Sequence, residues 1–499
     1  MIINKNMFSV NASYANVLRM RQQMDSLQIQ LATGKKAQTL SDMGPNRAVG
    51  IDLRQQVSRI DAYQNNITMV GVRLDVVDLA LTRMGDIASE ARKFAATDTV
   101  GENKINLVTA QNYSSSQLDE VINLLNSKAA GRYLLAGSDT DDPPVASFDA
   151  MMNGEGAKAG FRTIVSERKA ADAGANGMGR IGVALAGATL TLSEDGVHPF
   201  GLKMGAVSSE STAVSATQPA GSPAAMGLTF TAVPNEGEKT FVTFTLPDGT
   251  SSTISLTATS TTTPKEDEYT LGADAATTAQ NFETALNSAI SSLAGGELAS
   301  ASVFAAADNF FNGNGDTVQR VDGPPFDSAT SLIAGTPSNS VAWYDGSSSA
   351  SARKSVSARV GQSASVNYGV EGNEKGFLDL VKSLAAMAVE TFPNTDATSE
   401  KRYGALVERQ TALLAQSNNN SSGSLEVITM ELGIVRNTMG NYLDRNNNYK
   451  VQAQTVISQL EDAPVSDVVM KIKNLDLRLQ ASYQVMSVIS KLTMVNYIR

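Results

Sequence analysis

Apolar residues in the first part of the chain recur at alternating steps of three and four positions. A sustained repeat of this kind predicts a helix whose apolar seam packs on a partner helix. Thr33-Gly34 ends the first run, with glycine at the C-terminal cap position, and a third, shorter run covers 118–129. The two longer runs consist of Val17, Met20, Met24, Leu27 and Leu31, and of Val70, Leu74, Val77, Leu81, Met84, Ala88, Ala91 and Ala95.

The last part of the chain has the same pattern. A seam extended over 425–460 predicts a helix about 50 Å long, closed by Pro464. An intramolecular bundle and a coiled coil between molecules both explain such seams, and pairing the two ends of the chain is the simplest solution. The long seam contains Leu425, Ile428, Leu432, Val435, Met439, Tyr442, Asn446, Tyr449, Ala453, Val456 and Leu460, and a last helix contains Val468, Ile472, Leu475, Leu479, Met486 and Ile489.

The middle of the chain changes period and predicts β-structure. Of 14 prolines, 11 lie from Pro143 to Pro337, which disfavours long helices there. The segments 240–246 and 252–256 alternate apolar and polar residues around the turn Pro247-Asp248-Gly249-Thr250 and predict a hairpin. A helix is expected over 277–294. We expect a compact α+β unit at about 200–345, with 145–200 as a second small unit or a loose part of the first.

Composition then excludes most chemistry. The chain of 499 residues has no Cys and one His, so thiolate nucleophiles, cysteine zinc sites and sites with two imidazoles are excluded. A net charge of −10 disfavours nucleic-acid binding. The first residues contain no apolar signal-peptide core, and no apolar run is long enough to predict membrane insertion. The inventory predicts a structural protein without cofactors, not an enzyme.

Three segments resemble ligand or metal sites, but each is expected to have no such role. Gly177-Met178-Gly179-Arg180-Ile181-Gly182 matches G-x-G-x-x-G but lacks a preceding strand, so a flexible loop is expected. His198 lies in a turn and is expected at the surface, without metal partners. Asn312, Asn314 and Asp316 offer oxygens to calcium, but their spacing does not complete an EF-hand loop, so no metal site is predicted.

Several segments together resemble the bacterial flagellin family. They are Leu27–Lys35, Asn46–Gly50 with Leu53-Arg54, Tyr63–Ile67, Gly131–Ser138 and, at the other end, Leu479–Gln484 with Ser490–Ile498. The last pair resembles the hook–filament junction protein more than the filament subunit. The resemblance covers both ends of the chain and does not extend to the middle.

The resemblance implies an α+β multidomain fold: a long coiled-coil-like helical bundle built from both termini, with an inserted β-rich outer domain. The terminal segments 1–44 with 465–499 would form the core of a helical tube, 45–140 with 355–464 a surrounding helical layer, and 141–354 the outer domain. Val17, Met20, Met24, Leu27, Leu31, Ile472, Leu475, Leu479, Met486 and Ile489 would carry polymerisation. Val70, Leu74, Val77, Leu81, Met84, Leu425, Ile428, Leu432, Val435 and Met439 would form the seam of the layer.

The implied function is that of a structural flagellar subunit, exported by the flagellar type III apparatus without a cleaved signal peptide and assembled outside the cell. Its implied partners are further copies of itself, other axial proteins on the hook and filament sides, and an export chaperone. Junction protein and major filament flagellin both remain open. An extracellular adhesin, with a glycan-binding insert on a helical stalk, is the alternative outside the family.

Overall fold

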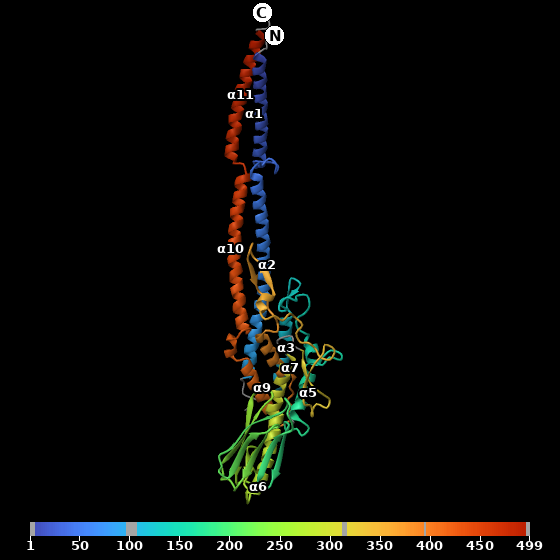
Figure 1. Cartoon of the computed structure of the whole chain (residues 1–499). Helices are drawn as coiled ribbons and strands as arrows, with labels where there is room; N and C mark the ends of the chain where they lie inside the picture. Colours follow the sequence, from blue (N-terminus) through green and yellow to red (C-terminus); the bar gives the residue numbers. More distant parts are fainter. Residues whose placement is uncertain (1–4, 96–106, 312–316, 394–395, 496–499) are drawn as a thin grey trace. The chain divides into compact units, whose positions relative to one another are not determined.

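The computed structural model describes residues 5–95, 107–311, 317–393 and 396–495 (Figure 1). The chain divides into two compact units. The terminal-helix unit comprises Met1–Met69, Arg359–Ser365 and Thr438–Arg499, and the sheet-bearing unit comprises Val70–Ala358 and Val366–Asn437. Long helices from both ends of the sequence accompany several β-sheets from its middle, so the predicted α+β multidomain class is confirmed.

The terminal-helix unit is built from helices of both chain ends. Helix α1 (Lys5–Thr33) packs along α11 (Val465–Val495), as Figure 1 shows. The unit also holds the first part of α2 (Asn46–Ala95) and the last part of α10 (Leu425–Glu461). The predicted helix ends at Gly34 and before Pro464 are confirmed. Gly34 has a φ of 68°, a left-handed conformation that glycine adopts without strain and that ends α1.

The sheet-bearing unit contains the remaining helices. Helix α3 (Leu107–Leu125) packs on α8 (Lys375–Val389), and α9 (Ser399–Leu413) follows α8. The short α4 (Phe148–Asn153) precedes α5 (Phe161–Ala173), and two 3₁₀ turns cover Ala352–Ser355 and Gln416–Asn420. The predicted third helical run is too long at its C-terminal end, because Ala129 belongs to strand β1 and not to α3.

Three small antiparallel pairs connect segments of the chain. They are β1 (Lys128–Ala129) with β2 (Arg132–Tyr133), β11 (Gln319–Val321) with β12 (Leu332–Ala334), and β13 (Ser357–Arg359) with β14 (Ser365–Asn367). The turn between β1 and β2 places Ala130 and Gly131 at positive φ. This hairpin is where the chain leaves the N-terminal helices.

Two four-stranded sheets form the β-rich part. One has the order β3-β4-β7-β6 and is antiparallel, and the other has the order β10-β9-β8-β5 with only β9 and β10 parallel. The predicted hairpin is confirmed, since Val242 of β8 faces Ile254 of β9. The strands are β3 (Ile181–Ala186), β4 (Thr189–Glu194), β5 (Lys203–Ser209), β6 (Val214–Ala220), β7 (Ala225–Phe230), β8 (Lys239–Thr245), β9 (Ser251–Thr259) and β10 (Glu268–Thr270).

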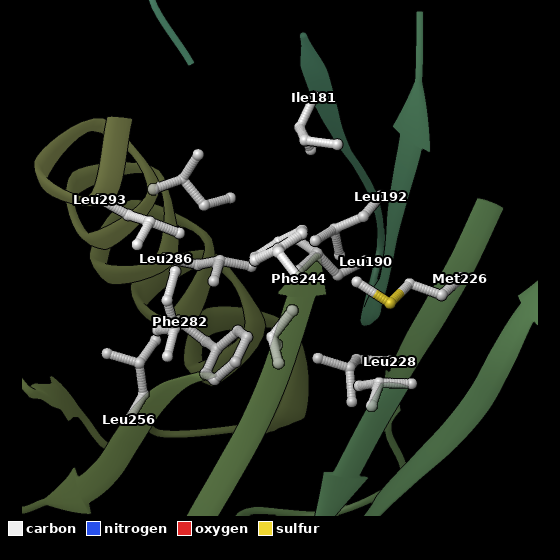
Figure 2. Packing of buried hydrophobic residues seen from close by; sticks show 14 of the residues in the cluster. Ile181, Leu190, Leu192, Met226, Leu228, Phe244, Leu256, Phe282, Leu286 and Leu293 are labelled. Carbon is white, nitrogen blue, oxygen red and sulfur yellow. The ribbon is translucent and has the colours of Figure 1, made fainter. Parts of the chain in front are cut away.

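One apolar core joins both sheets to helix α6 (Ala275–Leu293), which is capped by the Asp274 carboxylate. Figure 2 shows the α6 side chains of Phe282 and Leu286 pointing toward Leu190 and Phe244 of the strands. The helical prediction for 277–294 is confirmed. A π-turn (Ala294–Leu298) joins α6 to α7 (Ala299–Phe310).

Together these helical elements form a stretch, Ala275–Phe310, that is long and apolar enough to cross a membrane by length and composition. Its most apolar window is 67% buried inside the protein, as expected of a core helix.

Candidate functional site

The paired helices α1 and α11 carry the residues that the sequence assigns to polymerisation. Val17, Leu475 and Leu479 are buried between them. The other members of the set keep part of their surface exposed: Met20, Met24, Leu27, Ile472, Met486 and Ile489 are half-buried, and Leu31 is exposed. The structure therefore brings the predicted seam together along one helix pair but does not bury it fully.

A second set of apolar side chains on the same two helices is exposed. Leu477 is 66% exposed and Met470 is 64% exposed on α11, and Tyr14 is 56% exposed on α1. Sequence periodicity missed these residues, because they fall outside the steps of three and four that define the seam. The sequence does contain a signal for them, because α1 and α11 hold more apolar residues than a single seam requires. The others among the described side chains are Leu18, Ile29, Val465, Tyr483, Val485 and Val488.

Polar contacts fix the point where α1 ends and α11 begins. The Lys36 amide donates to the Glu461 carbonyl at 2.7 Å, and the Ala463 amide donates to the Gly34 carbonyl at 2.8 Å. Arg54 pairs with the buried Glu461 carboxylate at 2.6 Å. The two helix ends are thus joined through their backbones as well as their side chains.

The Lys35 ammonium completes this junction. Its hydrogen bond with Asp462 raises the pKa of Lys35 and lowers the pKa of Asp462, to which the Ser458 hydroxyl also donates. The two pKa shifts are opposite in direction but have the same cause, because the contact favours the charged form of each partner.

Almost all of the residues predicted for the seam of the helical layer are buried. Val70, Leu74, Val77, Leu81 and Met84 of α2 are buried, and so are Leu425, Ile428, Leu432 and Met439 of α10; Val435 is half-buried. Asn446, the polar position of the α10 seam, is buried and donates to the Val360 carbonyl at 3.0 Å. Farther along, Tyr449 and Val456 are exposed, so the predicted α10 seam is not buried over its full length.

Residues 177–180 of the glycine-rich segment form a loop, and strand β3 begins at Ile181 within the segment. The dinucleotide interpretation does not apply, because a helix would be required where this strand begins. Gly177, Gly179 and Arg180 have positive φ. A Cβ on Gly179 would lie 2.8 Å from side-chain atoms of Leu202 and Leu298, so only glycine fits there. The loop turns Arg180 inward.

His198 is buried, and the prediction of a surface histidine was wrong. Its side chain is 1% exposed. Nε2 lies 2.6 Å from the Asp195 carboxylate, and Nδ1 accepts from the Phe200 amide at 3.3 Å. Both ring nitrogens are therefore satisfied, and the residue is structural.

Asp195 also pairs with Arg180, whose guanidinium donates to the carbonyls of Asp327 and Ala329, each at 3.0 Å. This cluster ties the loop before β3 to the loop after β4 and to residues 327–329. Its charged groups are matched with partners, which is the behaviour of a structural joint.

Metal ligation finds no support within the described residues, which contain no group of three or more His, Cys, Asp or Glu side chains able to hold an ion. The calcium candidates Asn312, Asn314 and Asp316 lie outside the described residues.

The geometry of long helices from both chain ends agrees with a sequence comparison. A family model described as the bacterial flagellin N-terminal helical region matches residues 3–140. Residues 3–140 are thus a bacterial flagellin N-terminal helical region. The resemblance predicted from the sequence is confirmed for this region, which covers α1, α2, α3 and the β1–β2 hairpin. No curated protein matches the chain.

The match at residues 3–140 supports a structural subunit of the bacterial flagellum. The family polymerises into extracellular filaments, which agrees with a helix pair that leaves apolar side chains exposed. The exposed apolar side chains of α1 and α11 make these two helices the candidate functional site.

Proposed function

We propose that the protein polymerises through α1 and α11 into the axial tube of the flagellum, at the hook–filament junction or in the filament. The observation that supports this most is the second apolar face on these two helices. Side chains such as Leu477, Met470 and Tyr14 are more than half exposed in a single chain. Since exposed apolar surface of this extent is unfavourable in water, other copies of the chain would cover it.

The proposal assigns a role to each part of the chain. Residues 1–44 with 465–499 form the core of the tube, 45–140 with 355–464 the surrounding layer, and 141–354 the outer domain. The near-complete burial of Val70, Leu74, Val77, Leu81 and Met84 supports a layer that is already packed before assembly. The terminal seam residues, only half-buried, would gain their remaining contacts on assembly.

The number of copies per flagellum distinguishes the two alternatives within this function, junction protein and filament flagellin. A short ring next to the hook would identify the junction protein, and subunits all along the filament would identify flagellin. The C-terminal segments Leu479–Gln484 and Ser490–Ile498 favour the junction protein. In either case the neighbours are hook-side and filament axial proteins, and delivery uses a chaperone and the flagellar export apparatus without a cleaved signal peptide.

Deletion of residues 465–499 tests the proposed role of α11. We expect the deleted chain to keep its sheet-bearing part folded, measured by near-UV circular dichroism, and to form no filaments in electron micrographs. A deletion variant that still forms long filaments would show that α11 is not required for assembly.

A further inference from the structure

A groove lies between α2 and α10 within the terminal-helix unit. The two helices run side by side here, since Gln64 donates to Asn447 at 2.7 Å and Lys450 pairs with Asp61 at 2.7 Å. The tip of the β13–β14 hairpin, Gly361–Ala364, also lines the groove. The groove has a volume of about 550 Å³, and the side chains that matter most in it are those of Arg59, Tyr63, Gln362, Tyr442, Arg445 and Tyr449.

The groove is cationic and rich in hydrogen-bond donors. Its lining contains two arginines and three tyrosines but no carboxylate. Arg59 is exposed and forms no ion pair with the residues that the structure describes, and the Arg445 guanidinium lies 4.2 Å from the centre of the Tyr442 ring. Guanidinium groups bind carboxylates in a two-point geometry, and tyrosine hydroxyls and glutamine amides can add donors. The chemistry of this groove fits an acidic segment.

The hairpin tip that lines the groove is held in place by hydrogen bonds from three side chains. Asn446, which is buried, donates to the Val360 carbonyl at 3.0 Å, and Asn66 donates to the Arg359 carbonyl at 3.2 Å. The Arg359 guanidinium donates to the Gly361 carbonyl at 3.3 Å. The groove is therefore formed before any ligand arrives, which lowers the cost of binding.

The same chain carries a segment of complementary charge. Asp139, Asp141 and Asp142 lie on an exposed loop after β2, and none of them forms an ion pair within the described part of the chain. The loop is shaped by backbone bonds, with the Tyr133 amide donating to the Thr140 carbonyl at 2.9 Å and the Asp139 amide donating to the Ala136 carbonyl at 3.3 Å. Three carboxylates within four residues are thus presented on an ordered turn.

We propose that the Asp139–Asp142 loop of a second copy of the chain docks into the Arg59/Arg445 groove. The proposal rests on the proposed function, because it names a contact between neighbouring subunits. The groove and the loop are different surfaces, so the contact is head-to-tail, and such a contact builds an open filament when the rotation between neighbours does not close a ring. Complementary charges of this kind accelerate association and fix the register of the partners more than they add affinity.

Charge reversal on the full-length chain tests the contact. Elongation of wild-type filament fragments by added monomer is followed by light scattering. We expect R59D/R445D to slow elongation about tenfold, equivalent to about 1.4 kcal/mol, and D141R/D142R to do the same. A chain with all four changes restores the charge pairing when it elongates fragments of its own filaments, and there it should recover most of the wild-type rate. Wild-type elongation should also slow as NaCl is raised.

K158E/R162E is the matched control, because it reverses two exposed basic residues outside the groove and should elongate at the wild-type rate. Far-UV circular dichroism establishes that each variant is folded, and R59Q/R445Q serves as a milder variant if the reversal unfolds the chain. Wild-type protein that never assembles would overturn the proposed function. Wild-type assembly with groove variants that elongate normally, or a fourfold variant without recovery, would overturn the docking proposal alone.

Discussion

Lys35 and Asp462 are 427 residues apart in the sequence, and the Lys35 ammonium lies 2.5 Å from the Asp462 carboxylate. The pair sits where α1 ends and α11 is about to begin, next to the two backbone hydrogen bonds that join the helix ends. Both side chains are about half exposed. The contact therefore marks the register between the two ends of the chain more than it adds stability.

Removing this pair should change local stability in a pH-dependent way. The pKa of Asp462 is lowered from its ordinary 3.8, so its stabilisation is fully present above that value and is lost as pH falls through the lower, folded pKa. We expect Asp462→Asn to speed hydrogen exchange of the Ala463 amide at pH 7 and to have no such effect at acid pH, where the wild-type carboxyl is also neutral.

Asp25→Asn, at an exposed site on α1, is the control and should leave this exchange unchanged at both pH values. Equal exchange in wild type and Asp462→Asn at pH 7 would show that the ion pair does not hold the junction.

Leu475→Asp should reduce assembly strongly. Leu475 is buried between α1 and α11, and a carboxylate there would have to be desolvated without a partner. Thr262→Asp introduces the same group at an exposed site in the sheet-bearing unit and should assemble normally. Filament yield by sedimentation measures both variants, and similar yields would contradict the assignment of Leu475 to the assembly core.

Phe282→Ala should destabilise the sheet core by about 3–5 kcal/mol, the usual cost of removing a buried ring. The Phe282 ring is fully buried and lies 5.3 Å from the ring of Phe230 and 5.0 Å from that of Tyr269. Denaturant unfolding followed by circular dichroism measures the change, with Thr262→Ala expected within about 0.5 kcal/mol of wild type. A loss below 1 kcal/mol (roughly the average for any substitution) would contradict the packing described for α6.

Arg180→Met should loosen the joint before β3 and cost about 1–3 kcal/mol. The change leaves the carbonyls of Asp327 and Ala329 without their donor and removes the partner of Asp195. Trp343, the single tryptophan of the chain, provides a fluorescence signal for unfolding of this unit. Arg162→Met, at an exposed position, controls for loss of an arginine. Equal unfolding midpoints for the two variants would contradict the proposed role of Arg180 in holding these loops together.

The amino-acid sequence by itself determined the elements with strong local patterns. Seams of apolar residues predicted α2 and α10, and the alternation around Asp248-Gly249 predicted β8 and β9. The helix α6 followed from its single apolar face. These features are local, since a residue's place on a helix or strand face depends only on its near neighbours in sequence.

Strands β5, β6 and β7 were not predicted, because glycine, alanine and serine interrupt their alternation and only pairing within the sheets stabilises them. The burial of His198 was missed for a related reason. Its partner Asp195 is near in sequence, but Arg180 and the loop at 327–329 that enclose the cluster are not.

Only the tertiary structure decided which of the apolar seams pack against one another. Periodicity assigns an apolar seam to α1 and to α11 but carries no information on their register, which depends on contacts such as Lys35 with Asp462 and Arg54 with Glu461. It also could not reveal that both helices keep a second apolar face exposed, or that Arg59 and Arg445 line one groove. Long-range proximity is a property of the folded chain, because it follows from the sum of packing over hundreds of residues and not from any local segment.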